Sequence, residues 1–203
     1  SVPGGVRSPL PEEGRAWIRE RLPESYQTIH TALALFKELL ERFSTEVANF
    51  GEFPSLFMGL VGKDGLWEHY GGHIRFTDSQ GNIVADNLRE EDYQDYIGES
   101  VEKWSYLKFP YYKPLGYPEG IYRVGPLARL NVCSHFGTPG ADGELREYRD
   151  RVGGVATSSF YYHYARLVEI LGALEGIEAL IEDGDIVSHR TRAQGGINAL
   201  EGV

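Results

Sequence analysis

The histidine and acidic residues near position 70 are of the types that bind metal ions in proteins. His69 and His73 stand four residues apart, with Glu68 and Asp78 nearby. On a helix, that spacing would place two imidazoles on one face, as in many zinc sites. A Gly-Gly pair separates the two histidines, however, and favours a turn over a helix. We therefore expect exposed loop histidines here rather than metal ligands.

The single cysteine, Cys133, is the other residue with metal or nucleophilic chemistry. His135 beside it could supply half of a soft-metal site, but no second thiolate exists to complete one. We expect a buried structural cysteine. Ser158 and Ser159 stand at an expected helix start, where hydroxyl groups cap helices. The sequence has no G-x-S-x-G elbow, phosphate-binding loop or G-x-G-x-x-G motif.

Charged residues elsewhere leave two interpretations open. Glu99 and Glu102 are either an acid pair for catalysis or, as we favour, solvated carboxylates. Arg123, Arg129 and Arg166 each lie in an apolar or aromatic neighbourhood, and arginine is rarely buried without a partner.

Glu169 follows Arg166 by three residues, so the two side chains could pair on one helix. We expect Arg123, Arg129, Arg166 and Glu169 to form ion pairs that tie helices together. The alternative is that they orient a cofactor or a partner subunit. We assign no residue a catalytic, cofactor-binding or metal-ligating role.

Composition excludes several classes of protein. The chain has 203 residues and a net charge of -10, which argues against nucleic-acid binding. No apolar run reaches the roughly 18 residues of a membrane span, and the first residues lack the apolar core of a signal peptide. A single cysteine suits a reducing compartment. We therefore expect a cytoplasmic protein that binds neither nucleic acid nor membrane.

Hydrophobic periodicity predicts the elements that would position these residues. We expect helices at 11–22 and 24–50, separated at Pro23. Four short strands should form an antiparallel sheet at 55–61, 66–70, 74–78 and 82–85, followed by a polar helix at 89–97.

The second half should contain an irregular aromatic stretch and more helices. Residues 105–122 show no helical period, and 127–136 fit a helix or a strand, of which we favour the helix. Further helices are expected at 142–151 and 157–182, and the glycine-rich tail 194–203 should have none. The fold class is α+β, mostly helical with long packed helices and a small antiparallel sheet. Segments 1–54, 55–103 and 104–203 should form one structural unit.

Several motifs stand together in an order that a known family shares. They are WSYLKFPYYKPLGYPEGIYRVGPLARLNVC at 104–133, FPSLFMGLVGKDG at 53–65, SSFYYHYAR at 158–166, VPGG at 2–5 and YIGESVE at 96–102. Over nearly its whole length, the chain resembles the large subunit of cytoplasmic NAD-reducing nickel–iron hydrogenases. The resemblance implies a hydrogenase large-subunit-like fold.

The resemblance also implies cofactors and partners. In that family, hydrogen is split at a nickel–iron centre held by four cysteines in two Cys-x-x-Cys pairs. The partners are a flavin module that reduces NAD and a small iron–sulfur subunit. Both cysteine pairs are missing here, so we expect the central segment of a large subunit, with no cofactor of its own and no activity alone.

Two further expectations follow. The alternative function is a metal-free scaffold subunit, comparable to the hydrogenase-related subunit of respiratory complex I. In an isolated segment the long helices should expose apolar surface, which predicts self-association.

Overall fold

The computed structural model describes residues 5–192, and these form six α-helices and seven strands. The helices are α1 (Glu12–Arg42), α2 (Ser44–Asn49), α3 (Tyr93–Tyr96), α4 (Pro126–Val132), α5 (Pro139–Val152) and α6 (Tyr161–Glu182). The strands are β1 (Leu56–Val61), β2 (Trp67–Glu68), β3 (His73–Thr77), β4 (Ile83–Leu88), β5 (Ile97–Val101), β6 (Lys108–Tyr112) and β7 (Tyr122–Arg123). The glycine-rich tail at 194–203 lies outside the described residues.

One continuous helix replaces the two that we expected on either side of Pro23. Helix α1 contains Pro23 in its interior and ends at Arg42, after which the short α2 begins. Proline removes one helical hydrogen bond and usually breaks a helix. Here α1 buries one face, with residues spaced by seven, four and seven positions: Leu22, Ile29, Leu33 and Leu40. Packing of this face against the rest of the molecule outweighs the local cost of the proline.

The main sheet is built around β1. Its strand order is β2-β1-β3-β4, and β7 also pairs with β1. The β1–β2, β1–β3 and β3–β4 pairs are antiparallel, as expected. The β1–β7 pair is parallel, with Leu56 opposite Tyr122 and Phe57 opposite Arg123. A strand from the second half of the chain thus pairs with the first strand of the sheet.

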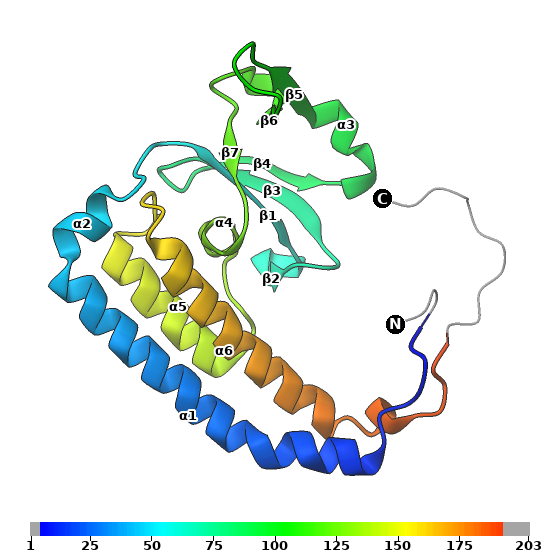
Figure 1. The fold of residues 1–203 in the computed structure, drawn as a ribbon. Coiled ribbons are helices and arrows are strands. Elements are labelled where there is room, and N and C mark those ends of the chain that lie inside the picture. Colours follow the sequence, from blue (N-terminus) through cyan, green and yellow to red (C-terminus); the bar gives the residue numbers. More distant parts are fainter. Residues whose placement is uncertain (1–4, 193–203) are drawn as a thin grey trace.

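A second sheet uses part of the stretch 105–122 that we expected to be irregular, since β6 lies within it and β5 lies just before it. Strands β5 and β6 form an antiparallel ribbon from Ile97↔Tyr112 to Val101↔Lys108. The ribbon extends away from the helices at the far side of the main sheet (Figure 1). The expected helix at 89–97 is shorter and consists of a 3-10 turn followed by α3. Aromatic side chains hid the alternation of β6, because they lie on both of its faces.

Apart from α3, which lies beside the β5–β6 ribbon, the helices lie on one side of the main sheet (Figure 1). Helices α1, α5 and α6 pack on one another, and the short α4 lies between α6 and β1. Gly125, which has φ 86°, precedes Pro126 at the start of α4. Of residues 127–136, for which we favoured a helix, only those up to Val132 are helical, and the backbone is extended at Cys133.

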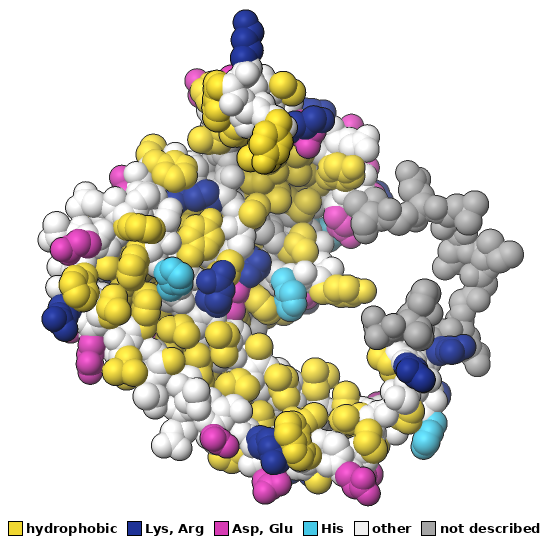
Figure 2. Space-filling model, viewed as in Figure 1, with side chains coloured by type: hydrophobic (Ala, Val, Ile, Leu, Met, Phe, Trp, Pro, Cys, Tyr) yellow, Lys and Arg dark blue, Asp and Glu magenta, His cyan; other side chains and the backbone are white. Residues whose placement is uncertain are grey.

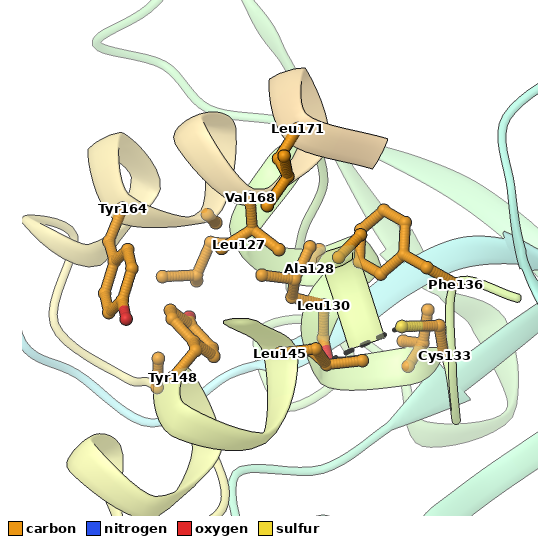
Figure 3. Close-up of a cluster of buried hydrophobic side chains, with 14 of the residues drawn as sticks. Leu127, Ala128, Leu130, Cys133, Phe136, Leu145, Tyr148, Tyr164, Val168 and Leu171 are labelled. Carbon is orange, nitrogen blue, oxygen red and sulfur yellow. Dashed lines mark hydrogen bonds between the residues drawn. The ribbon is translucent and has the colours of Figure 1, made fainter. Parts of the chain in front are cut away.

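The main hydrophobic core surrounds α4. Figure 3 shows side chains of α5 and α6 converging on Leu127, Ala128 and Leu130, each of which is fully buried. Tyr148 and Tyr164 close one end of this cluster, with ring centroids 5.2 Å apart. A separate, smaller core lies on the other side of the main sheet, around Leu56, Ile74, Phe76, Tyr96 and Tyr112.

The remaining helices begin and end near their expected positions. Helix α5 begins at Pro139, three residues before the expected start, and α6 begins at Tyr161 rather than 157. The α+β class with long packed helices and a small sheet is confirmed, and about half of the chain is helical. Within residues 5–192, no helix is both long and apolar enough to cross a membrane.

Close contact between α4 and β1 generates a stability prediction. A Cβ atom added at Gly59 in β1 would lie 2.7 Å from Val132 Cγ2, whereas nothing lies within 4 Å of one added at Gly71. We expect Gly59→Ala to lower the free energy of unfolding by about 1–3 kcal/mol. The matched control, Gly71→Ala, should change it by about 0.5 kcal/mol or less. Urea unfolding followed by circular dichroism measures both, and equal effects would contradict the packing described.

Candidate functional site

A mostly buried carboxylate, Glu169, lies where the helices meet the main sheet. Arg129 donates two hydrogen bonds to it, from Nε to Oε1 at 2.6 Å and from Nη2 to Oε2 at 2.7 Å. Trp67 donates a third, from Nε1 to Oε1 at 3.0 Å. The side chains of Arg129 and Glu169 are 26% and 11% exposed. Three hydrogen bonds, two of them from a guanidinium, therefore hold this carboxylate in place with little help from solvent.

Each partner in this cluster comes from a different element. Glu169 lies on α6, Arg129 on α4 and Trp67 on β2. The indole of Trp67 also stacks on Phe136, with centroids 5.1 Å apart. Gly59 in β1 permits the approach of α4, because a Cβ there would meet Arg129 Cα at 3.4 Å as well as Val132. The absence of a side chain at Gly59 and the hydrogen bonds to Glu169 together set the position of the Arg129 guanidinium.

The pairing of Glu169 with Arg166, which we expected from the sequence, is wrong. Arg166 is exposed on α6 and makes no ion pair within residues 5–192. Arg129, 40 residues away in sequence, takes its place. Spacing along one helix favoured the local partner, but α6 turns Glu169 toward α4.

Arg123 is held without a carboxylate. It is only 9% exposed, and its guanidinium donates to Ser55 Oγ at 2.9 Å, Thr157 O at 2.6 Å and Phe53 O at 2.8 Å. The rings of Phe53 and Phe57 lie 4.3 and 4.9 Å from its Cζ atom. Burial lowers the pKa of Arg123, but an arginine remains protonated in proteins. This side chain joins β7 to the loops before β1 and α6.

A second arginine–carboxylate pair was not found from the sequence. Arg75 donates from Nε and Nη2 to the two carboxylate oxygens of Asp86, at 2.9 and 2.8 Å. Its Nη1 donates to Val132 O at 3.1 Å, which links β3 to the end of α4. The hydrogen bonds from Arg75 are the main cause that holds the pKa of Asp86 below its ordinary value. No sequence signal marks this pair, because its members lie on separate strands.

The histidines and the cysteine do not converge. His69 and His73 are both exposed, and the part of the chain that the structure describes has no group of three or more metal-ligating side chains. Cys133 is buried, and burial raises the pKa of its thiol to about 11. Its Sγ lies 3.9 Å from Leu130 O and 3.8 Å from Arg149 Nη2.

The two serines that precede α6 hold the end of α2 in place. Ser158 Oγ donates to Val47 O and, at 3.2 Å, to Phe50 O, while Ser159 Oγ donates to Gly51 O at 2.9 Å. These bonds hold the end of α2, and the two residues after it, against the start of α6. The two serines are not helix caps of the expected kind, since the first residue of α6 is Tyr161.

Comparison with known proteins shows extended similarity to hydrogenase subunits. The chain is 38% identical over 193 residues to the A subunit of the F420-non-reducing hydrogenase vhu of Methanococcus voltae, covering 95% of this chain and 46% of that protein. It is 38% identical over 196 residues to the NAD-reducing hydrogenase HoxS subunit beta of Cupriavidus necator, covering 92% and 39%. The chain therefore spans about half the length, or less, of the curated relatives it matches.

A solved structure is similar as well. One chain of an NAD+-reducing NiFe hydrogenase in the H2-reduced state matches with a TM-score of 0.89 and 38% identity, over 96% of this chain and 44% of that one. No family model matches the sequence.

These comparisons correct the type of subunit that we expected from the sequence. The two relatives above are named as an A subunit and a beta subunit, and neither name specifies a nickel-dependent large subunit. A third relative, 31% identical over 218 residues, is named as the iron–sulfur A subunit of an F420-non-reducing hydrogenase, from Archaeoglobus profundus. The similarity to hydrogenases stands, and the fold matches that of a hydrogenase subunit. The large-subunit assignment and the metal-free scaffold alternative are withdrawn.

The cofactor prediction is corrected on the same ground. We expected no cofactor in this segment and a nickel–iron centre in its parent, whereas the name of the Archaeoglobus relative indicates an iron–sulfur cofactor. Iron–sulfur clusters are held by several cysteine thiolates. The chain has one cysteine, and burial keeps it protonated. The described residues therefore do not fit such a cluster by themselves.

The Glu169 cluster generates a prediction about stability. We expect Glu169→Gln to lower the free energy of unfolding by about 1–3 kcal/mol, because Arg129 loses a charged acceptor in a mostly buried site. Glu182→Gln is the control, since Glu182 lies on the same helix in an exposed pair with Arg19 and should change stability by about 1 kcal/mol or less. Urea unfolding measures both, and Trp67 emission should shift only in Glu169→Gln. Equal losses would contradict the assignment.

Burial of Cys133 generates a prediction about reactivity. The pKa of its thiol is raised from 9.0 to about 11, so the thiolate fraction at pH 8 falls about a hundredfold, and the thiolate is the nucleophile. We expect the folded chain to react with a disulfide reagent at least about a hundred times more slowly than the chain in urea. Absorbance of the released thiolate measures the rate. Similar rates in the two states would show an accessible, ionised thiol.

Proposed function

We propose that this chain is part of one subunit of a hydrogenase complex, an oxidoreductase that passes electrons between hydrogen and NAD. The observation that carries the proposal is the TM-score of 0.89, at 38% identity over 96% of the chain, with a chain of an NAD+-reducing hydrogenase. Identity of this size over nearly the whole chain is far above the level at which fold alone is shared. The name of the Cupriavidus relative supports the same electron acceptor.

The described residues have a positioning role in this proposal. Arg123, Arg129 and Arg75 each join elements far apart in sequence, and all three guanidinium nitrogens of Arg123 and Arg75 donate within the chain. Iron–sulfur chemistry of the kind named for one relative would need thiolates beyond the single buried Cys133. The chain would thus fix the geometry of neighbouring parts of the complex.

Other subunits are part of the proposal. The partners we propose are a flavin module that reduces NAD and an iron–sulfur subunit. The tip of the β5–β6 ribbon offers a contact surface, with Val101, Trp104, Tyr106 and Leu107 exposed by 72%, 74%, 96% and 57%. Exposed aromatic side chains on a projecting element are typical of subunit interfaces. The use of a single cysteine supports a cytoplasmic location for the complex.

Purification of the native complex tests the proposed activity. The subunit that contains this chain is tagged in its native host, isolated with whatever it binds, and assayed for hydrogen-dependent formation of NADH. We expect NADH formation and co-purified iron–sulfur and flavin subunits. Hydrogen oxidation with an artificial acceptor but not with NAD would overturn the proposed acceptor. No hydrogen oxidation with either acceptor would overturn the hydrogenase assignment.

The ribbon tip is tested in the same preparation. We expect the double variant Trp104→Ser, Tyr106→Ser to lose at least about tenfold of the co-purified partner, because large aromatic residues dominate many interfaces. Tyr70→Ser is the matched control, since Tyr70 is 94% exposed on the β2–β3 turn, away from the ribbon. Equal recovery of partner with both variants would exclude the tip as a contact.

A further inference from the structure

Helix α5 begins on a carboxylate that another helix supplies. Glu175 of α6 accepts hydrogen bonds from the backbone N–H groups of Gly140, at 2.7 Å, and Ala141, at 2.9 Å. Figure 2 shows hydrophobic side chains gathered over the helix layer on the face that it draws, and a carboxylate among such groups needs donors. The first N–H groups of a helix are free to donate, and the helix dipole favours negative charge there. Glu175 thus joins α6 to the start of α5.

Two glycines leave room for this contact. A Cβ atom added at Gly140 would lie 2.7 Å from Glu175 Oε1. One added at Gly172 in α6 would lie 2.9 Å from Phe136 Cδ1 and 3.3 Å from Ala141 Cβ. The close approach of the start of α5 to α6 therefore depends on the absence of a side chain at both positions.

The cap that α5 carries in its own sequence is not in use. Thr138 is the N-cap residue and has φ -129° and ψ 140°, the extended backbone typical of that position. An N-cap threonine ordinarily accepts from the N–H group of the second or third helical residue, here Gly140 or Ala141. Glu175 occupies both groups, and within residues 5–192 the buried Thr138 Oγ1 has no hydrogen-bond partner. A second cap for α5 is thus present but idle.

The start of α5 is also connected to the Glu169 cluster. Asp142 Oδ1, in the first turn of α5, accepts from the backbone N–H group of Phe136 at 2.6 Å. The ring of Phe136 stacks on Trp67, whose indole donates to Glu169. A shift of the start of α5 relative to α6 would therefore move Phe136 and change the surroundings of Trp67.

We propose that the start of α5 is a two-position element, held against α6 when Glu175 caps it and released from α6 when Thr138 caps it. The carboxylate prevails in the structure described, because charge-assisted hydrogen bonds are stronger than neutral ones. The Thr138 hydroxyl keeps the first turn of α5 formed when the carboxylate is withdrawn. Glu175 is accordingly a positioning residue for the contact between Trp67 and Glu169. This inference does not rest on the proposed function.

A double-mutant cycle tests the exchange of caps. We expect Glu175→Met, which keeps the helix propensity but removes both acceptor oxygens, to lower the folding equilibrium constant by about threefold to tenfold. Thr138→Val alone should change it by about twofold or less, because the hydroxyl has no partner to lose. The double variant should lose about fivefold or more beyond the product of the single effects, since neither cap then remains.

Urea unfolding followed by circular dichroism measures the four constants of this cycle. Thr28→Val is the matched control, because Thr28 is exposed on α1 and bonds only to Glu24 O of the same helix. Its effect should multiply with that of Glu175→Met without any coupling. If the effects of Thr138→Val and Glu175→Met also simply multiply, Thr138 does not replace Glu175 and the proposal is overturned.

Fluorescence tests the positioning role of Glu175. The other two tryptophans, Trp17 and Trp104, are 57% and 74% exposed, so replacing both by phenylalanine leaves Trp67 as the sole emitter. In that background we expect Glu175→Met to shift the Trp67 emission maximum, and Glu175→Gln, which retains one acceptor oxygen, to shift it less. Thr138→Val should leave the maximum in place, because the Glu175 cap remains. An unchanged maximum in folded Glu175→Met, or an equal shift in Thr138→Val, would overturn the proposal.

Discussion

The carboxylate of Glu169 is the group on which the arrangement of sheet and helices depends. It accepts hydrogen bonds from side chains that lie 40 and 102 residues away in sequence. Moving an ion pair out of water is costly, and only good geometry with added hydrogen bonds repays that cost. The bidentate contact with Arg129 and the third bond from Trp67 meet this requirement. One side chain of α6 thereby fixes both α4 and β2.

Close packing around α4 makes that contact possible. Helix α4 has seven residues, too few to be stable on its own. Its shape is imposed from outside, by the absence of a side chain at Gly59, by the fully buried Leu127 and Leu130, and by the hydrogen bond from Arg75 to Val132 O. Arg123 has a similar role at the far end of β1, where three acceptors and two aromatic rings surround one guanidinium. The polar interior of this protein is thus organised mainly by arginines.

Sequence patterns predicted the features that depend on neighbours along the chain. The long helices follow from the spacing of residues such as Ile29 and Leu33, and β1 follows from a compact apolar run before a glycine turn. The continuation of α1 through Pro23 did not follow, since tertiary packing decides it. Nor did the partner of Glu169, because the rotation of α6 relative to α4 leaves no trace in local spacing. The β5–β6 ribbon was missed because aromatic residues on both faces of β6 obscure a two-residue period, and because β5 is short and polar. Motif order indicated a hydrogenase, but motifs within half of one subunit did not identify its type.

The parallel pairing of β7 with β1 has a consequence for how the chain folds. The two strands are joined by residues 62–121, which include β2 to β6, and both members of the pair must be present before the ladder can close. Closing long loops costs entropy before any contact is gained, and folds with many distant pairings form slowly. On the ribosome, β1 would emerge with β3 and β4 and remain open along the edge that β7 later takes. The backbone groups of β1 that pair with β7 therefore stay without their partner from the synthesis of residue 61 until that of residue 123.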